Sequence, residues 1–288
     1  MTEPALMALL HRLERFLPED AQEPDWSQPA FRWRRRSVFG HGFGVLEAVA
    51  QPNWITLGDL HNIASQQAEI VRNTRQFVAG HLANNVLLTG ARGTGKSSLI
   101  KAVLQAFHRD GLRLVEVDKA DLVDLPDIVA RLLGRPERFI VFCDDLSFEE
   151  GETGYKALKS VLDGSIAAHS SNVLVYATSN RRHLLPEFFD ENRQARHVDG
   201  EVHPGDAVEE KISLSERFGL WLSFYPFSQA EYLHAVRHWL QAFGVADWSE
   251  EVERAALLWA QGRGARSGRV AWQFARDWAG RCSLPPLP

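Results

Sequence analysis

The stretch Gly90-Ala91-Arg92-Gly93-Thr94-Gly95-Lys96-Ser97 decides the fold of this chain. Its glycines let the backbone curl so that successive N–H groups point inward, where they bind phosphate oxygens. Residues 86–89 before it are a short apolar run typical of a buried strand, and residues 97–107 after it repeat apolar side chains at helical spacing. A strand, a glycine-rich loop and a helix N-terminus together form an anion site. The stretch therefore predicts a nucleotide-binding P-loop rather than a glycine-rich turn without a ligand.

Two side chains of this loop have defined partners in nucleotide chemistry. Lys96 reaches the β- and γ-phosphates, and the Ser97 hydroxyl is a ligand of Mg²⁺. We therefore expect ATP and Mg²⁺ as cofactors. The predicted ATP-binding residues of the loop and the helix start are Gly90, Ala91, Arg92, Gly93, Thr94, Gly95, Lys96, Ser97 and Ser98.

The composition is that of a chain with a substantial core and no strong charge bias. Its 288 residues suffice for one large or two modest domains, and its net charge of −5 does not favour indiscriminate nucleic-acid binding. Two cysteines are too few for a disulfide framework, so we expect a cytoplasmic location. The N-terminus lacks a basic start followed by a long apolar stretch, and no run approaches about 18 apolar residues. We therefore expect neither secretion nor a membrane span.

Apolar, strand-like runs alternate with helical patterns through the middle of the chain. The expected strands are residues 86–89, 112–117, 139–143, 173–177 and 220–225. The expected helices between them are residues 96–109, 127–133, 155–168 and 207–218. This alternation predicts an α/β fold, a P-loop NTPase with a five-stranded parallel sheet that is covered on both faces.

After Pro226 the strand patterns stop. Three helices rich in Trp and Ala are expected at residues 228–243, 249–260 and 267–279, and they predict a small all-helical lid domain. We expect the chain to divide into an N-terminal extension, a nucleotide-binding core and the lid domain, at residues 1–52, 53–226 and 227–288.

The N-terminal extension changes its charge abruptly. Residues 4–17 have the spacing of an amphipathic helix, and the prolines after it predict an extended acidic linker. Residues 31–36, Phe-Arg-Trp-Arg-Arg-Arg, are basic and interleaved with aromatic side chains. Such a run contacts nucleic acid through phosphates and stacking, or it pairs with the chain's own acidic surface or with bound nucleotide. The sequence leaves these alternatives open.

A second, acidic motif complements the P-loop. Residues 139–143 form an apolar strand that ends in Asp144 and Asp145, and carboxylates at the C-terminal edge of a parallel sheet face the ligand crevice. Asp144 is the expected Mg²⁺ partner, and Asp145 is at the position of a base that polarises the attacking water. The strand at 173–177 leads to Asn180, whose amide either holds that water or caps the next turn.

These motifs resemble those of the AAA+ ATPases, a branch of the P-loop NTPases, over residues 54–278. The resemblance assigns Walker A to residues 90–97, Walker B to residues 139–145 and sensor 1 to Asn180. More narrowly, the wording of several stretches is similar to one bacterial AAA+ family, domain of unknown function 815. Those stretches are residues 83–88, 144–149 and 210–220.

The resemblance implies a homo-oligomer, either a hexamer or a spiral, with sites shared between subunits. Arg217 corresponds to the arginine finger, which reaches the γ-phosphate of a neighbouring protomer. Its alternative role is an ion pair within the chain, with Glu209, Glu210 or Glu216 as the partner. The resemblance also assigns a sensor 2 arginine to Arg269, with Arg266 as the second candidate. The predicted catalytic residues are Lys96, Asp144, Asp145, Asn180 and Arg217, and the predicted metal ligands are Ser97 and Asp144.

One residue departs from the family pattern. AAA+ proteins usually carry Asp-Glu where this chain has Asp-Asp, and the shorter Asp145 side chain ends about 1 Å further from the water, which can cost on the order of 10²-fold in rate. We therefore hypothesise slow hydrolysis, with Asp145 as the base or with Glu149 or Glu150 assisting.

Other candidates have a functional and a structural interpretation. Leu60 and Ile63 line the adenine pocket or pack in the core. His234 and His238 lie one helical turn apart, a spacing compatible with metal binding, but the sequence offers no third ligand, so we interpret them as structural.

The leading functional prediction is an AAA+ ATPase that couples its nucleotide state to remodelling or loading of an unidentified macromolecular partner, protein or nucleic acid, with no membrane partner. The alternative is a slowly hydrolysing, nucleotide-dependent binding switch, which includes a nucleic-acid loader. A small-molecule kinase is a weaker third class, because it leaves Arg217 and Arg269 unexplained.

Overall fold

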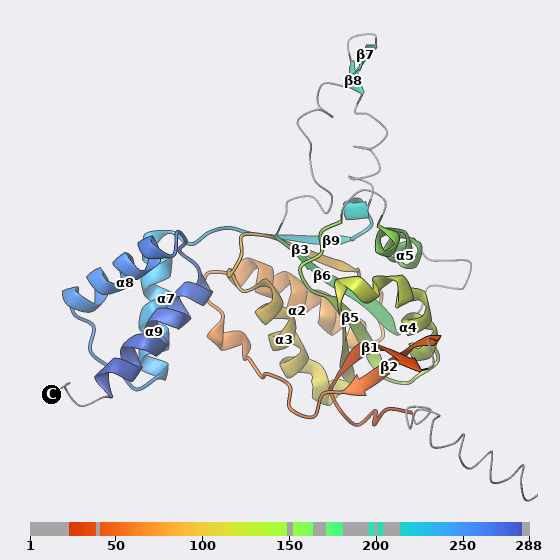
Figure 1. Cartoon of the computed structure of the whole chain (residues 1–288), viewed down its shortest axis with the longest axis horizontal. Coiled ribbons are helices and arrows are strands. Elements are labelled where there is room, and N and C mark those ends of the chain that lie inside the picture. Colours follow the sequence, from red (N-terminus) through yellow and green to blue (C-terminus); the bar gives the residue numbers. More distant parts are fainter. Residues whose placement is uncertain are drawn as a thin grey trace, which may run out of the picture.

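In the part of the chain that the structure describes, seven strands form one sheet, in which six run parallel (Figure 1). The computed structural model describes residues 23–38, 41–148, 152–163, 171–180, 196–198, 201–203 and 214–283. The strands are β1 (Ala30–Val38), β2 (His41–Ala48), β3 (Val86–Gly90), β4 (Leu112–Val117), β5 (Arg138–Cys143), β6 (Val173–Ser179) and β9 (Leu220–Phe224). Their order across the sheet is β2-β1-β4-β5-β6-β3-β9, and only β2 is antiparallel to its neighbour.

The five predicted strands are all present, but the expected number of five is wrong. β1 pairs with β4 and β2 pairs with β1, so residues assigned to an extension belong to the sheet. Phe31 and Trp33 are buried, whereas the side chains of Arg32 and Arg34 are 39% and 41% exposed. This alternation is the period-2 pattern of a half-buried strand, which the charges of the run obscure.

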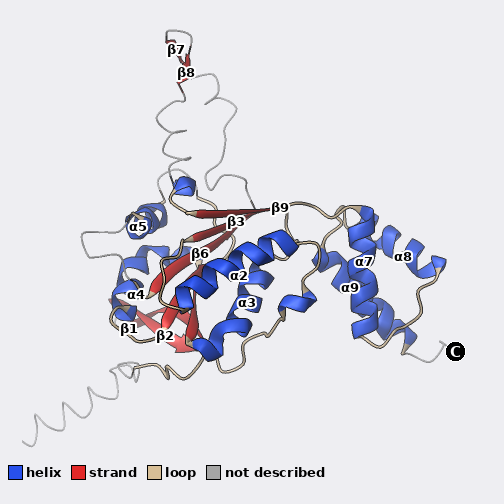
Figure 2. Cartoon of the chain, turned by 180° about the vertical axis from the view of Figure 1, so that it is seen from behind, coloured by secondary structure: helices blue, strands red, loops and turns tan. Residues whose placement is uncertain are grey.

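Helices cover both faces of the sheet, as the sequence predicts (Figure 2). Consecutive strand residues serve opposite faces: Ile140 packs with the helices α2 and α3, and Val141 packs with α4 and α5. The chain is thus doubly wound around two apolar layers. These helices are α2 (Ala64–Val78), α3 (Lys96–Phe107), α4 (Leu125–Leu132) and α5 (Thr153–Leu162).

The helix predictions hold best next to the glycine loop. α3, α4 and α5 overlap the predicted helices, although α5 ends at Leu162 and residues 164–168 of the predicted helix lie outside the described residues. The helix α2 has no counterpart in the predicted elements. Of the predicted helix at 207–218, residues 214–216 are helical and the part before them lies outside the described residues, as does the predicted helix at 4–17. Short elements complete the description: η2 (Leu57–Asp59), η3 (His108–Asp110), η4 (Lys119–Asp124) and the antiparallel pair β7 (Arg196–Val198) and β8 (Glu201–His203).

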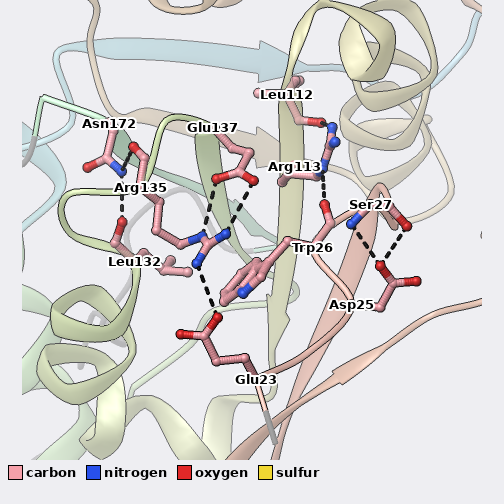
Figure 3. Close-up of polar contacts among 10 residues, drawn as sticks. All are labelled: Glu23, Asp25, Trp26, Ser27, Leu112, Arg113, Leu132, Arg135, Glu137 and Asn172. Atoms are coloured by element: carbon pink, nitrogen blue, oxygen red, sulfur yellow. Dashed lines mark hydrogen bonds and ion pairs between the residues drawn. The ribbon is translucent and has the colours of Figure 1, made fainter.

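The segment before β1 is fastened across the beginnings of β4 and β5 (Figure 3). The guanidinium of Arg135 lies 3.9 Å from the centre of the Trp26 ring, and it pairs with Glu137 at 3.2 Å. Arg113 Nε donates a hydrogen bond of 3.1 Å to the carbonyl of Trp26. These contacts hold the entry to β1 at the amino ends of the strands, away from the glycine loop.

Three helices form a unit with its own core beside the sheet, as predicted (Figure 1). Each begins at a serine whose hydroxyl accepts the backbone N–H three residues further on, a hydrogen bond that stabilises a helix start. The helices are α7 (Gln229–Ala242), α8 (Glu250–Gly262) and α9 (Gly268–Cys282), capped by Ser228, Ser249 and Ser267.

None of the helices in the described part of the chain combines the length and apolar character that a membrane crossing requires.

Candidate nucleotide site

Three adjacent strands bring the predicted site residues to one edge of the sheet. β5, β6 and β3 are neighbours and run parallel, so their carboxyl ends meet there. Residues 90–97, called the glycine loop below, begin at the last residue of β3; Asp144 and Asp145 follow β5, and Asn180 follows β6. The strand order therefore joins segments that lie far apart along the chain.

Two glycines of the loop stand where a side chain would collide with a neighbouring element. Gly90 has a φ of 129°, and a Cβ atom there would lie 1.9 Å from the carbonyl oxygen of Phe224 in β9. Gly93 has a φ of 76°, and a Cβ atom there would lie 2.7 Å from Ser267 Oγ in the helical unit. Glycine adopts such φ values without steric cost. The loop is therefore closely packed on both sides.

The ammonium group of Lys96 is buried and turned back into the loop. Its Nζ donates hydrogen bonds to the carbonyls of Gly90 and Ala91, both at 2.8 Å, and to Asn180 Oδ1 at 2.9 Å. Burial lowers the pKa of Lys96 from its ordinary value, and the two nearby aspartates oppose that shift. All three acceptors are neutral, so a negatively charged phosphate oxygen in the place of a carbonyl would form a stronger hydrogen bond with the ammonium.

Asp144 joins the glycine loop to β6 through one carboxylate oxygen. Ser97 Oγ and Thr178 Oγ1 each donate a hydrogen bond of 2.6 Å to Asp144 Oδ1. The serine hydroxyl and the carboxylate are both oxygen donors, the ligand type that Mg²⁺ prefers, and they are in direct contact. The chemistry of this pair therefore fits Mg²⁺.

Asp145 and Asn180 continue the network toward Lys96. Asn180 Nδ2 donates a hydrogen bond of 2.5 Å to Asp145 Oδ1, while its Oδ1 accepts from Lys96. The amide of Asn180 thus links the cation of the loop to the second carboxylate. Glu149 and Glu150, the predicted assistants of Asp145, lie outside the described residues.

These side chains line a cavity of about 910 Å³ between the sheet edge, the segment before α2 and the helical unit. This volume falls in the range of small-molecule sites. Gly90 and Ala91 lie behind Lys96 and contribute carbonyls rather than cavity wall. The predicted site residues that line the cavity are Leu60, Ile63, Arg92, Gly93, Thr94, Gly95, Lys96, Ser97, Ser98, Asp144, Asp145, Asn180 and Arg269.

The same wall contains several residues that the sequence pattern does not indicate, above all Thr178, His61, Trp54, Phe227, Trp239 and Trp272. The apolar and aromatic ones come from the segment before α2 and from the helical unit, where their spacing is that of ordinary core residues. Thr178 stands in the small polar run that ends β6, and that run is the one signal pointing to it.

The helical unit contacts the glycine loop through backbone atoms. The N–H of Arg269, in the first turn of α9, donates a hydrogen bond of 3.2 Å to the carbonyl of Gly93. A second junction joins Asn62 Nδ2 to the carbonyl of Glu231 in α7 at 3.1 Å. A displacement of the helical unit therefore acts directly on the loop.

His61 packs at this second junction. Its ring centre lies 5.2 Å from that of His234 and 4.1 Å from that of His238, both on α7. Burial lowers the pKa of His61 from its ordinary value, the two histidines of α7 add to the shift, and Asp59 opposes it. Over the described residues, no group of three or more His, Cys, Asp or Glu side chains is arranged to hold a metal ion.

Arg217 lies apart from this network. It precedes β9, at the amino end of a strand whose carboxyl end touches the glycine loop, and it is not among the cavity residues. It forms an ion pair with Asp163, which follows α5 and is not one of the three predicted acidic partners. Glu209 and Glu210 lie outside the described residues.

The basic run of β1 is paired with the chain's own carboxylates. Each of its four arginines has an acidic partner on β2, on β4 or in the segment after β4, which is one of the alternatives that the sequence left open. The pairs are Arg32 with Glu116 at 2.5 Å, Arg34 with Asp118 at 3.2 Å, Arg35 with Asp124 at 2.8 Å and Arg36 with Glu47 at 2.6 Å.

Together, the parallel sheet, the glycine loop, the paired aspartates and the helical unit give the chain the fold of the AAA+ P-loop NTPases. Known structures of this class have the same fold. A point mutant of RuvB from Thermotoga maritima matches with a TM-score of 0.54 and 15% identity over 81% of this chain and 69% of its own. The Orc1 protein of Aeropyrum pernix, solved in complex with DNA, matches with a TM-score of 0.54 and 14% identity over 78% of this chain. The match spans 62% of the Orc1 chain, less than two thirds of its length.

The sequence itself identifies the family. The family model described as "Protein of unknown function (DUF815)" matches residues 27–282, and the chain belongs to this family. No curated protein is significantly similar to it in sequence.

Proposed function

We propose that this chain is a cytoplasmic, Mg²⁺-dependent ATPase that couples its nucleotide state to remodelling or loading of a macromolecular partner. The convergence of Lys96, Asp144, Asp145 and Asn180 at one wall of the cavity is the observation that carries this proposal. In it, Lys96 exchanges its carbonyl acceptors for the phosphates, and Asp145 orients the attacking water with Asn180. Mg²⁺ held by Ser97 and Asp144 would neutralise charge on the phosphates.

The same proposal includes slow turnover. The carboxylate of Asp145 is one methylene shorter than the usual glutamate and is already bonded to Asn180 at 2.5 Å. We expect Asp145→Glu to hydrolyse ATP faster, on the order of 10²-fold if the distance to the water is the limit. The measurement is steady-state phosphate release, with Asp145→Asn as the variant that loses the base. An Asp145→Glu variant that turned over no faster would refute the distance argument.

We further propose that copies of the chain assemble and share their sites, as a hexamer or a spiral. Arg217 and the glycine loop lie at opposite ends of β9 and β3, so this arginine is remote from the site of its own chain. A trans role would require Arg217 to leave Asp163 on assembly, and it would accelerate hydrolysis by roughly 10³–10⁵-fold.

The first experiment is the ATP hydrolysis rate per protomer over a wide range of protein concentration. A specific rate that climbs with concentration, and that Arg217→Ala abolishes, supports a shared site. A rate that is independent of concentration and unchanged in Arg217→Ala would refute it. ATP binding without turnover would favour the alternative function below.

The helical unit is the proposed lid, comprising residues 227–288, against a nucleotide-binding core. The hydrogen bond between Arg269 N–H and the Gly93 carbonyl supports this division of labour, since ligand-induced movement of the loop must move α9. In this proposal the Arg269 side chain senses the γ-phosphate from the lid side of the cavity.

The second candidate function is a slowly hydrolysing binding switch, which the short Asp145 side chain favours. Nucleic acid is one partner class for it, as in the DNA complex of the Orc1 protein. Salt-dependent binding of single-stranded DNA with ATP present would support this version. Loss of that binding in an Arg34/Arg35/Arg36→Ala variant would assign it to β1. These arginines would then have exchanged their carboxylate partners for DNA phosphates.

A further inference from the structure

One buried hydroxyl joins the two aspartates that follow β5. Thr178 is 1% exposed and stands next to the last residue of β6. Its Oγ1 donates a hydrogen bond of 2.6 Å to Asp144 Oδ1 and accepts one of 2.9 Å from the N–H of Asp145. A hydroxyl has a single proton, so donating it to Asp144 leaves only the lone pairs for Asp145. Thr178 therefore fixes both residues at once.

The backbone of Asp145 needs this support. Asp145 has a φ of 52°, in the left-handed region, where a non-glycine residue is strained and persists only when its surroundings hold it. The carbonyl of Thr178 also accepts the N–H of Leu146 at 2.7 Å. Thr178 thus holds two successive N–H groups of the turn, which directs the Asp145 carboxylate to Asn180 at 2.5 Å.

We propose that Thr178 is a positioning residue for ATP hydrolysis, acting through the orientation of Asp144 and Asp145. The inference rests on the proposed function. The described contacts of the Lys96 ammonium do not include Thr178. Loss of the Thr178 hydroxyl therefore lowers kcat and leaves the affinity for the phosphate chain in the absence of Mg²⁺ intact.

The test compares two substitutions with a matched control. Thr178→Val keeps the shape and removes the hydroxyl, whereas Thr178→Ser restores it. The control is Thr74→Val: this threonine of α2 is also fully buried, and its hydroxyl also has two partners, the Ile70 carbonyl at 2.8 Å and the Tyr176 hydroxyl at 2.9 Å. It lies outside the cavity wall.

Thr178→Val lowers kcat by about 10²-fold, the effect of a misplacement near 1 Å, while the affinity for ATP without Mg²⁺ is unchanged. Thr178→Ser recovers most of the rate. Thr74→Val keeps the wild-type kcat, while its melting temperature falls about as far as that of Thr178→Val, because both lose buried hydrogen bonds.

A second measurement needs no turnover. Calorimetric titration with ATP, with and without Mg²⁺, gives the gain in affinity that Mg²⁺ supplies. We expect Thr178→Val to keep the Mg²⁺-free affinity and to lose much of this gain, because Asp144 loses one of the donors that orient it.

Each result has a distinct meaning. A folded Thr178→Val variant with wild-type kcat and wild-type Mg²⁺ dependence would overturn the inference. A loss of Mg²⁺-free ATP affinity as large as the loss of kcat would also overturn it, because such a loss indicates a structural role. If the wild-type chain does not bind ATP, the proposed function itself fails, and the inference that rests on it fails too.

Discussion

The glycine loop and the basic run of β1 are two conspicuous stretches of this sequence, and the structure treats their charges in opposite ways. In β1, Arg32, Arg34, Arg35 and Arg36 each pair with a carboxylate of the same chain. In the glycine loop, the ammonium of Lys96 is held by two carbonyls and an amide oxygen, all neutral. The arginines of β1 are thus paired with carboxylates, whereas the ammonium of Lys96 is bonded to neutral acceptors.

The contrast shows why a basic motif alone does not define an anion site. A cation paired with a fixed carboxylate must give up that partner before it binds another anion, so little free energy is gained. A buried ammonium on neutral acceptors forms stronger hydrogen bonds when negatively charged phosphate oxygens replace those acceptors. The function of a charged stretch therefore depends on which partners the fold supplies.

Lys96→Met is the variant with the largest expected effect on this comparison. It removes two charge-assisted hydrogen bonds to phosphate, each worth about 1.5–3 kcal/mol, so we expect the ATP affinity to fall by about 10²–10⁴-fold. Calorimetric titration with ATP measures it. Lys101→Met, in the same helix α3, is the matched control and keeps the wild-type affinity. Equal affinity of Lys96→Met and wild type would remove the distinction between the two regions.

Trp33→Ala tests the second region of the comparison, the basic run of β1, to which we assign a structural role. The Trp33 side chain is 2% exposed, and its Nε1 donates a hydrogen bond of 3.0 Å to Asp124. Removing it should lower the free energy of unfolding by about 3–5 kcal/mol, measured by urea denaturation, with the KM for ATP unchanged. Trp33→Phe should lose much less. A loss in Trp33→Ala as small as that of a surface substitution would show that β1 is no part of the core.

The sequence predicted the strands that are rich in apolar residues. β3, β5 and β6 are largely buried and contain continuous apolar runs, and β4 and the edge strand β9 also consist mostly of apolar residues. β1 escaped because arginines fill its outward positions and hide the inward Phe31 and Trp33. The helix α2 escaped because its sequence, with Gln66, Gln67, Arg72 and Asn73 among its residues, is polar over most of its length.

The sequence indicates the residues of the candidate site, but it does not indicate the hydrogen bonds between them. Glycine, lysine and aspartate have narrow roles in nucleotide chemistry, so their pattern indicates them directly. The contact between Asp145 and Asn180 depends on the strand order β5-β6-β3, which local periodicity does not encode. The same holds for Thr178, whose role exists only because β6 lies beside the end of β5.

The lowered pKa of His61, at the junction with α7, predicts how the stability of the protein depends on pH. Burial is the main cause of its lowered pKa, with His234 and His238 adding to it and Asp59 opposing it. The folded pKa then lies below the unfolded value of about 6.5, so the unfolded state binds more protons near that pH. The stabilising contribution is present above the unfolded pKa and is lost as the pH falls through the window below it.

We therefore expect wild type to lose more stability than His61→Phe between neutral pH and mildly acid pH. Thermal unfolding across this range measures the difference. His81→Gln, which changes an exposed histidine of the loop after α2, is the control and should follow wild type. Parallel profiles for wild type and His61→Phe would show that the imidazole at the junction does not titrate with folding.

Arg34→Gln has the smallest expected effect and bears most directly on the basic run. Arg34 and Asp118 are 3.2 Å apart, with side chains 41% and 55% exposed, so their coupling in a double-mutant cycle with Asp118→Asn should be about 0.2–1 kcal/mol. Arg35→Gln should cost more, since its partner Asp124 is 14% exposed and also binds Trp33. Because Arg34 already has an anionic partner, its loss should leave the salt dependence of any DNA affinity unchanged. If Arg34 contacts a phosphate, its loss would instead lower that slope by about one unit. The basic run would then bind phosphate, as we propose for the glycine loop.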